Sequence, residues 1–215
     1  MIATENETGV ERKYFAHPQA LVESSEIGPN TFIWAFAHVM EGARVGANCK
    51  IGDHAFIESG VVLGNNVTVK NGVAIWDRVT VEDNVFLGPN CVFTNDMNPR
   101  AYIKKTGAGL TPTLIRANAT VGANATIVCG VTIGRYAFIG AGTVVIRNVP
   151  DFALLVGNPA RLIGWMCVCA EKLPLPASAP FNSSVTCPHC GRSFKLTPEG
   201  LALCDAEPSG APGGR

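Results

Sequence analysis

The chain has 215 residues, and its 17 lysines and arginines balance 17 aspartates and glutamates, so the formal net charge is zero. A neutral chain has no general attraction to nucleic acid or to an anionic membrane surface, and we expect neither as a partner. No apolar run reaches the ~18 residues of a transmembrane helix, and residues 1–13 lack the basic start and apolar stretch of a signal peptide. We therefore expect a cytoplasmic protein without membrane insertion, with a flexible segment over residues 1–13.

The stretch that follows repeats a large apolar residue at every sixth position. These residues recur from Leu21 to Phe93 and from Ile115 to Val145, and a second small or apolar residue often stands four positions after each. An α-helix would spread such a period around all its faces, whereas both positions share one face of a strand. Glycine, asparagine and aspartate between them suit tight corners. The pattern predicts an all-β, parallel β-helix of hexapeptide repeats over residues 14–165, with about six triangular coils of eighteen residues.

The hexads are interrupted between Phe93 and Ile115 by an ejected loop, residues 94–114. The loop holds the polar side chains of Asn95, Asp96, Arg100, Lys104 and Lys105. Long loops without secondary structure of their own are usually lids or binding loops, although a solvated loop without function is the alternative. Because Asn95 follows Asp77 by eighteen residues, the two should be neighbours on adjacent coils. We predict a ligand pocket at the root of this loop.

The repeats end in the stretch DFALLVGNPARLIGW. With the hexads, the loop that begins FTND and continues to NPRA, and the stretch IVCGVTIGRYAFIGAGTVV, this ending resembles left-handed β-helix acyltransferases that N-acetylate nucleotide-linked amino sugars. The resemblance covers residues 14–165, and the FTND loop narrows it to sugar-nucleotide enzymes. It implies a left-handed coil, a homotrimer, and acetyl-CoA bound as co-substrate between the later coils of adjacent subunits.

The resemblance also implies an acceptor, the 3-amino group of a UDP-linked 3-amino-2-acetamido uronate in lipopolysaccharide O-antigen biosynthesis. A dTDP-3-amino-deoxyhexose acceptor and a non-catalytic β-helix scaffold remain alternatives. Acetyl transfer to an amine needs a neutral amine, a donor for the developing oxyanion and two aligned substrates. No cysteine or serine stands beside a visible base, so we expect direct attack by the amine in a ternary complex.

Two residues are candidates for catalytic work. The resemblance assigns Asn95 to orient the sugar amine, while the departing CoA sulfur accepts the proton. His38 is a second choice, because histidine is the usual general base. An outward or intersubunit contact is the alternative for His38, since it stands beside the repeat position Val39.

The acidic substrate and the coenzyme need further contacts. Arginine and lysine of the loop suit a diphosphate or a carboxylate, and the alternative for them is surface solubility. Trp76 follows a repeat position by one residue, so it should project outward, to stack on uracil or fill the trimer seam. The predicted substrate-binding set is Asp77, Asp96, Arg100, Lys104 and Trp76. The predicted coenzyme-binding set is Gly140, Ala141 and Gly142 for the pantetheine arm and Arg161 for a phosphate.

Residues 166–205 carry two short-spaced cysteine pairs. These are Cys167 with Cys169, and Cys187 with Cys190. Such pairs favour a four-thiolate structural zinc site, in a small zinc-ribbon-like appendage. Free thiols are the alternative, and His189 or Cys204 would serve if the first pair supplied one ligand only. A closed site leaves zinc no open position for catalysis. Residues 206–215 are rich in proline and glycine, and we expect disorder there.

Overall fold

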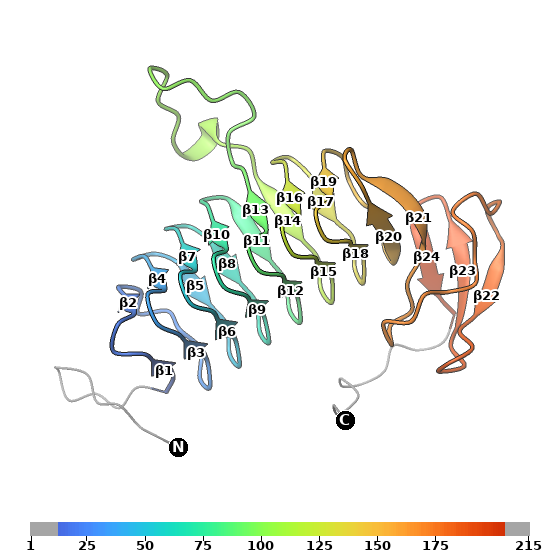
Figure 1. Cartoon of the computed structure of the whole chain (residues 1–215), viewed down its shortest axis with the longest axis horizontal. Helices are drawn as coiled ribbons and strands as arrows, with labels where there is room; N and C mark the ends of the chain where they lie inside the picture. The colour runs from blue at the N-terminus through green and yellow to red at the C-terminus, as the bar shows by residue number, and fades with distance from the viewer. Residues whose placement is uncertain (1–12, 205–215) are drawn as a thin grey trace.

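The computed structural model describes residues 13–204, and it is a parallel β-helix of three sheets (Figure 1). The first sheet contains, in order, β1 (Phe15–Ala16), β3 (Phe32–Ile33), β6 (Lys50–Ile51), β9 (Thr68–Val69), β12 (Phe86–Leu87), β15 (Thr120–Val121), β18 (Phe138–Ile139), β20 (Ala153–Val156) and β21 (Arg161–Trp165). The second contains β2 (Leu21–Val22), β4 (His38–Val39), β7 (Phe56–Ile57), β10 (Ala74–Ile75), β13 (Val92–Phe93), β16 (Thr126–Ile127) and β19 (Val144–Val145). The third contains β5 (Arg44–Val45), β8 (Val62–Leu63), β11 (Val79–Val81), β14 (Thr113–Ile115) and β17 (Thr132–Ile133).

The core is built from stacked columns of inward side chains. Ile33 pairs with Ile51 on the next coil, and Ile51 pairs with Val69, so residues eighteen apart lie on top of one another. All three are at most 1% exposed. Each coil therefore buries its apolar face against its neighbours, as repeat architectures require. The predicted all-β fold, a hexapeptide β-helix with an ejected loop, is confirmed.

The first coil departs from the predicted phase. Leu21 is 53% exposed and pairs with His38, whereas Val22 pairs with the buried Val39. Val22 is thus the inward residue, because a shift of one residue exchanges the two faces of a strand. The coil count also differs from the expected six. Eight parallel strands, from β1 to β20, stack in the first sheet, since the repeat continues at both ends where the apolar pattern is weak.

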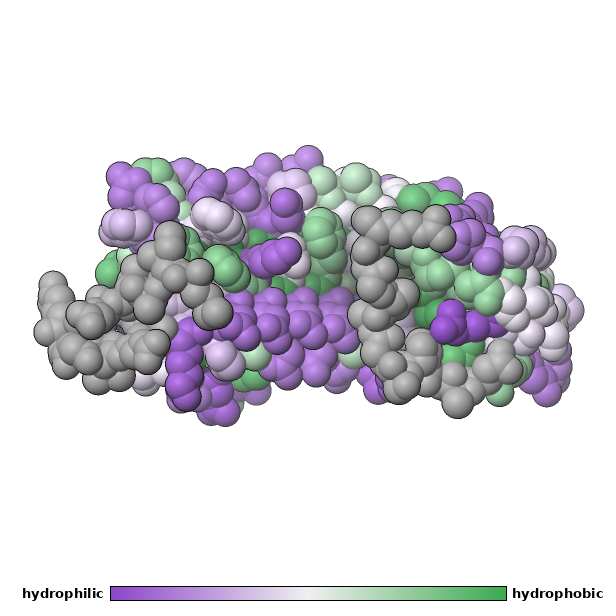
Figure 2. Space-filling model, turned by 90° about the horizontal axis from the view of Figure 1, so that it is seen from below, coloured by the Kyte–Doolittle hydropathy of each residue, from purple (hydrophilic) through white to green (hydrophobic). Residues whose placement is uncertain are grey.

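The corners carry the residue types that tight turns require. Asn66 and Asn84 have φ values of 56° and 60°, a left-handed conformation that asparagine tolerates. Their side chains form a ladder, in which Asn66 Nδ2 donates to Asn84 Oδ1 at 3.0 Å. A Cβ atom on Gly46 would lie 2.4 Å from the carbonyl oxygen of Gly64, so this close approach of coils excludes any side chain. Figure 2 shows a hydrophilic band running along the coils.

Two segments lie outside the coils. The ejected loop joins β13 to β14 and contains one short 3-10 turn, η1 (Gly107–Gly109). The appendage forms an antiparallel sheet of β22 (Ser184–Thr186), β23 (Ser193–Thr197) and β24 (Gly200–Leu203) beyond the last coil. In residues 13–204, no helix has the length and apolar character needed to cross a membrane. The predictions for residues 1–13, apart from Lys13, and for residues 206–215 lie outside the described residues.

Candidate active site

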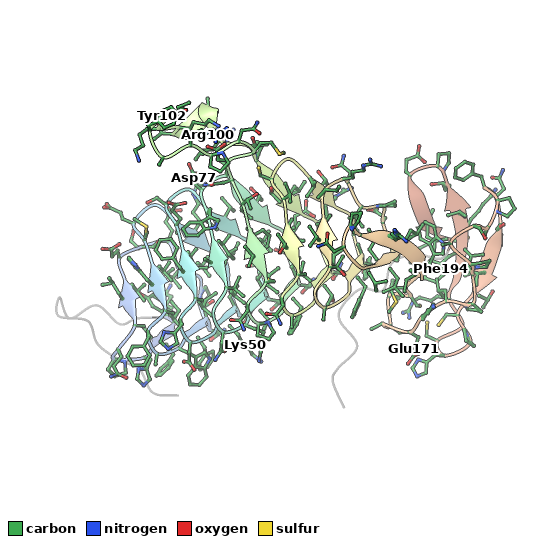
Figure 3. The ribbon with its side chains drawn as sticks, turned by 45° about the horizontal axis from the view of Figure 1, so that its top comes forward. Lys50, Asp77, Arg100, Tyr102, Glu171 and Phe194 are labelled. Atoms are coloured by element: carbon green, nitrogen blue, oxygen red, sulfur yellow. The ribbon has the colours of Figure 1, made fainter. Side chains whose placement is uncertain are left out.

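A cavity of about 410 Å³ lies where the ejected loop covers the corner that follows β10 and β13. Its polar lining includes Glu58, Asp77, Asn95, Asp96, Arg100 and Lys104. Ala74 pairs with Val92, so the equivalent positions Asp77 and Asn95 follow neighbouring strands at this corner. Figure 3 shows Arg100 on the part of the loop nearest Asp77, with Tyr102 farther out. The structure thus brings five of the sequence-predicted residues to one cavity.

The main chain and the side chain of Asn95 have different roles. Its main-chain oxygen accepts a hydrogen bond from the Thr111 N–H at 2.8 Å, which joins the two ends of the loop. Its side chain is half-buried, and the amide has no hydrogen-bond partner among residues 13–204. A carboxamide offers both donors and an acceptor. It is therefore available to a ligand in the cavity.

Two carboxylates face the same cavity. Glu58 Oε2 accepts a hydrogen bond from the Asp77 N–H at 2.7 Å, so Glu58 fixes the turn that carries Asp77. Both residues are half-buried, and neither makes an ion pair within the described part of the chain. Carboxylates are acceptors only, so the pair suits amine or hydroxyl hydrogens of a ligand. Sequence reasoning missed Glu58, although its place directly after the inward Ile57 requires an outward side chain.

The loop is braced by an internal ion pair. Lys105 Nζ lies 2.5 Å from Asp96 Oδ1 and also donates to the Asn98 carbonyl oxygen at 3.0 Å. The Asn98 N–H donates to the same Asp96 oxygen at 2.9 Å. The hydrogen bond from Lys105 lowers the pKa of Asp96 below its ordinary value. Asp96 therefore holds the loop together, whereas Arg100 and Lys104 make no ion pair within residues 13–204.

His38 lies away from this cavity. Its Nε2 is 3.1 Å from Glu23 Oε2, and its ring meets the edge of Phe56 at a centroid distance of 5.3 Å. Strands β7 and β10 separate β4 from β13, so the strand of His38 is about 14 Å along the axis from the strand that precedes Asn95. Within one chain the structure does not bring His38 to Asn95.

Trp76 lies on the outer surface beside the loop root. Its Nε1 donates to the Phe93 carbonyl oxygen at 3.0 Å, and its ring packs 5.5 Å from that of Phe56. The side chain projects outward, as its position in the hexad predicts, and it is half-buried. It does not line the cavity of the loop.

A second cavity, of about 290 Å³, lies at the end of the coils between β19 and the β20–β21 hairpin. Val145, Ile146, Leu155, Pro159 and Leu162 form apolar walls, and Arg147 supplies a cation. Thr126 pairs with both Val92 and Val144, so Arg147 occupies the same corner as Asn95, two strand spacings or about 10 Å along the axis. Arg147 was missed because the ejected loop interrupts the count of eighteen.

None of the predicted coenzyme-binding residues lines this second cavity, and the turn of Gly140, Ala141 and Gly142 precedes β19, whereas Arg147 follows it. Gly142 has φ +69°, and a Cβ atom there would have no neighbour within 4 Å, so the backbone of this turn is open. Ala141 is exposed in the same turn, and Gly140 precedes it after β18. Arg161 is exposed at the start of β21, next to the lining residue Leu162.

The four cysteines of the appendage converge. The sulfur atoms of Cys167, Cys169, Cys187 and Cys190 all lie within 4.8 Å of one another. Cys167 and Cys190 are 3.4 Å apart, and Cys169 and Cys187 are 3.7 Å apart. A tetrahedron with zinc–sulfur bonds of about 2.3 Å has edges of about 3.8 Å, so the cluster fits zinc. Burial would raise the pKa of Cys190, but hydrogen bonds led by the Arg192 N–H outweigh it and lower this pKa to about 6.

Comparison with known proteins identifies the family to which the repeats belong. The family described as bacterial transferase hexapeptide (six repeats) matches residues 24–59, 60–95 and 112–147. A dTDP-3-amino-3,6-dideoxy-alpha-D-galactopyranose 3-N-acetyltransferase of Aneurinibacillus thermoaerophilus is 50% identical over 181 residues, which cover 84% of this chain and 90% of the relative. The chain belongs to the hexapeptide-repeat acetyltransferases. The predicted enzyme class is therefore confirmed.

Two more distant matches cover only part of the matched proteins. The bifunctional protein GlmU of Synechococcus sp. (strain CC9311) is 28% identical over 149 residues, and the match covers 68% of this chain and 30% of GlmU. The acetyltransferase domain of PglB from Neisseria gonorrhoeae FA1090 is similar at 22% identity and a TM-score of 0.48, covering 70% of this chain and 57% of that one. The chain thus spans about half to a third of these proteins.

Proposed function

We propose that this acetyltransferase moves the acetyl group of acetyl-CoA onto the 3-amino group of a nucleotide-linked 3-amino-deoxyhexose. The observation that carries the proposal is the cavity in which the free Asn95 amide faces the carboxylates of Glu58 and Asp77. The 50% identical relative, named for a dTDP-3-amino-3,6-dideoxy-galactopyranose, supports a dTDP-linked acceptor.

The chemistry follows from the polarity of that cavity. The carboxylates of Glu58 and Asp77 accept hydrogen bonds from the amine, and Asn95 orients it toward the thioester. The amine nitrogen attacks the thioester carbon, the carbon–sulfur bond breaks, and the leaving sulfur takes the proton that the amine loses. No protein nucleophile is required, since the two substrates react directly in a ternary complex.

In this proposal, acetyl-CoA lies along the corner that carries both Asn95 and Arg147. Arg147 and the predicted Arg161 would meet its phosphates in and beside the terminal cavity. The thioester would then reach Asn95 across the about 10 Å that separate the Arg147 and Asn95 positions. The contact of the pantetheine arm with Gly140, Ala141 and Gly142 stays a prediction, because their turn precedes β19, at the opposite edge of the second sheet.

A homotrimer is part of this proposal. Phe32, Trp34 and Phe36 are 44%, 46% and 52% exposed on the first coils, and the ring of Phe15 lies 5.8 Å from that of Phe32. Phe15 also contacts Trp34, at a ring distance of 5.9 Å, and exposed aromatic side chains gathered in this way are characteristic of subunit interfaces. In a trimer, His38 would be able to contact the active site of a neighbouring subunit, whereas within one chain it lies far from Asn95. The cytoplasmic location stays a prediction.

A UDP-linked uronate of lipopolysaccharide O-antigen biosynthesis is the second candidate acceptor. Arg100 and Lys104 line the cavity without ion-pair partners among residues 13–204. Arginine binds a carboxylate with two parallel hydrogen bonds, so a uronate would satisfy Arg100. A deoxyhexose offers no carboxylate, and the two loop cations would then meet the diphosphate.

The acceptor is tested by measuring CoA release from acetyl-CoA with three substrates. These are a dTDP-3-amino-deoxyhexose, a UDP-3-amino uronate and the matching UDP-3-amino sugar without the carboxylate. Preference for the dTDP sugar supports the first proposal, and preference for the uronate over its neutral partner supports the second. Absence of turnover with all three would contradict both acceptor proposals.

We also propose that the four thiolates of the appendage hold one structural zinc ion. The sulfur separations of 3.4 and 3.7 Å support it, as does the absence of a fifth ligand in the cluster of described residues. Metal analysis of reduced, purified protein should give one zinc per chain. Protein with intact thiols and no zinc would contradict this site.

A further inference from the structure

The appendage, residues 166–204, packs against the last coil through aromatic rings. Phe194 of β23 lies in the appendage (Figure 3) and is fully buried. Its ring meets that of Phe152 edge-on at 5.4 Å. Phe152 in turn stacks on Tyr136 of the preceding coil at 4.9 Å, with the rings 4° from parallel. Such pairs contribute beyond the area they bury. The core of the appendage is thereby continuous with the end of the β-helix.

The main chain also crosses this junction. Gly200, at the start of β24, forms a parallel bridge with Asp151, and the Leu201 N–H donates to the Asp151 carbonyl oxygen at 3.3 Å. A Cβ atom on Gly200 would lie 2.8 Å from that oxygen and 2.9 Å from the Asp151 nitrogen, and φ at Gly200 is +128°. Only glycine permits this approach. The contact covers backbone that would otherwise be an open end of the coils.

The four cysteines close the appendage on itself. Cys167 and Cys169 follow β21 directly, whereas Cys187 and Cys190 lie between β22 and β23. A segment of this size is at about the 40-residue limit below which chains usually need a metal or disulfides to fold. Metal bound to both pairs would fix β23, and with it Phe194, relative to the strand that leaves the last coil.

We propose that the appendage is a metal-dependent cap of the β-helix, so that loss of zinc opens the last coil and its β20–β21 hairpin. This inference rests on the proposed zinc site and adds a role to it. End repeats of solenoid proteins need a covering element, because their apolar faces have no next repeat to pack against. The hairpin also forms one wall of the terminal cavity, so the cap supports the proposed coenzyme site.

The test is hydrogen exchange on the full chain, read by mass spectrometry together with zinc content. Cys190→Ser removes one proposed ligand, and Cys204→Ser changes an exposed cysteine outside the cluster. We expect Cys190→Ser to lose zinc and to exchange about tenfold faster or more over residues 151–165, with residues 50–63 unchanged as an internal reference. Cys204→Ser should match the wild type in both respects.

Gly200→Ala tests the junction independently of the metal. It should keep zinc and still raise exchange over residues 151–165, because the added methyl group meets Asp151. It also serves if Cys190→Ser fails to fold. Zinc loss with unchanged protection of residues 151–165 overturns the cap and leaves the zinc site standing. Wild-type protein that is folded but free of zinc overturns both, while CoA release judges the acetyltransferase proposal separately.

Discussion

Replacing Asn95 with alanine should lower turnover about a hundredfold and leave the fold intact. The Asn95 main chain holds Thr111 across the loop root, and this hydrogen bond survives the substitution. The side chain makes no hydrogen bond within residues 13–204, so its loss removes only contacts to the substrate. A group that positions a proton transfer contributes about a hundredfold or more to turnover, and a hundredfold change corresponds to about 2.7 kcal/mol.

The assay is steady-state CoA release at saturating acetyl-CoA, with the acceptor concentration varied. Asn98→Ala is the matched control, because Asn98 lies on the same loop and also uses its main chain structurally, but does not line the cavity. The control should stay near wild-type activity. The reasoning is refuted if Asn95→Ala keeps turnover within about threefold of wild type, or if Asn98→Ala loses as much.

Further predictions concern the core, the loop brace and the loop cations. Ile57→Ala, at a fully buried position, should lower the free energy of unfolding by about 2–5 kcal/mol in urea titrations. Asp96→Asn should speed proteolytic cleavage of the loop, because it removes the ion pair with Lys105. Since that pair lowers the pKa of Asp96, its stabilisation is present above the ordinary value of about 3.9 and is lost as the pH falls further, so cleavage by an acid protease should rise there. Arg100→Ala should raise KM for the sugar nucleotide about tenfold with kcat little changed.

The sequence was sufficient to predict the coil because side-chain direction alternates strictly along a strand. The spacing of eighteen placed Asp77 and Asn95 at one corner, and the cavity lies there. The prediction failed where the period changes by one residue, at Leu21, since nothing local distinguishes Leu21 from Val22. Glu58 was missed for another reason. Its contact with the main chain of Asp77 depends on how a long side chain bends, which a repeat does not specify.

Arg147 shows a further limit of counting along the chain. Its position matches that of Asn95 only when the residues of the ejected loop are left out of the count of eighteen. How many residues to leave out is known only from the pairing of Val92 with Thr126. The convergence of the four cysteines, by contrast, was predicted from short-range spacing alone, since each pair is local. The packing of the appendage against the last coil was not predicted, because Phe194 and Phe152 lie in segments that share no sequence pattern.

The register on either side of the ejected loop has a consequence for how such chains diverge. Val92 pairs with Thr126, 34 positions later, although Ala74 pairs with Val92 after 18 on the coil before the loop, and Thr126 pairs with Val144 after 18 on the coil beyond it. The ejected loop therefore leaves the β-helix and returns to it at the next coil. The pairing of the later coils does not depend on the length of the loop. Acceptor preference and the scaffold can accordingly change by separate genetic events, because insertions or deletions in this loop leave every later coil in register.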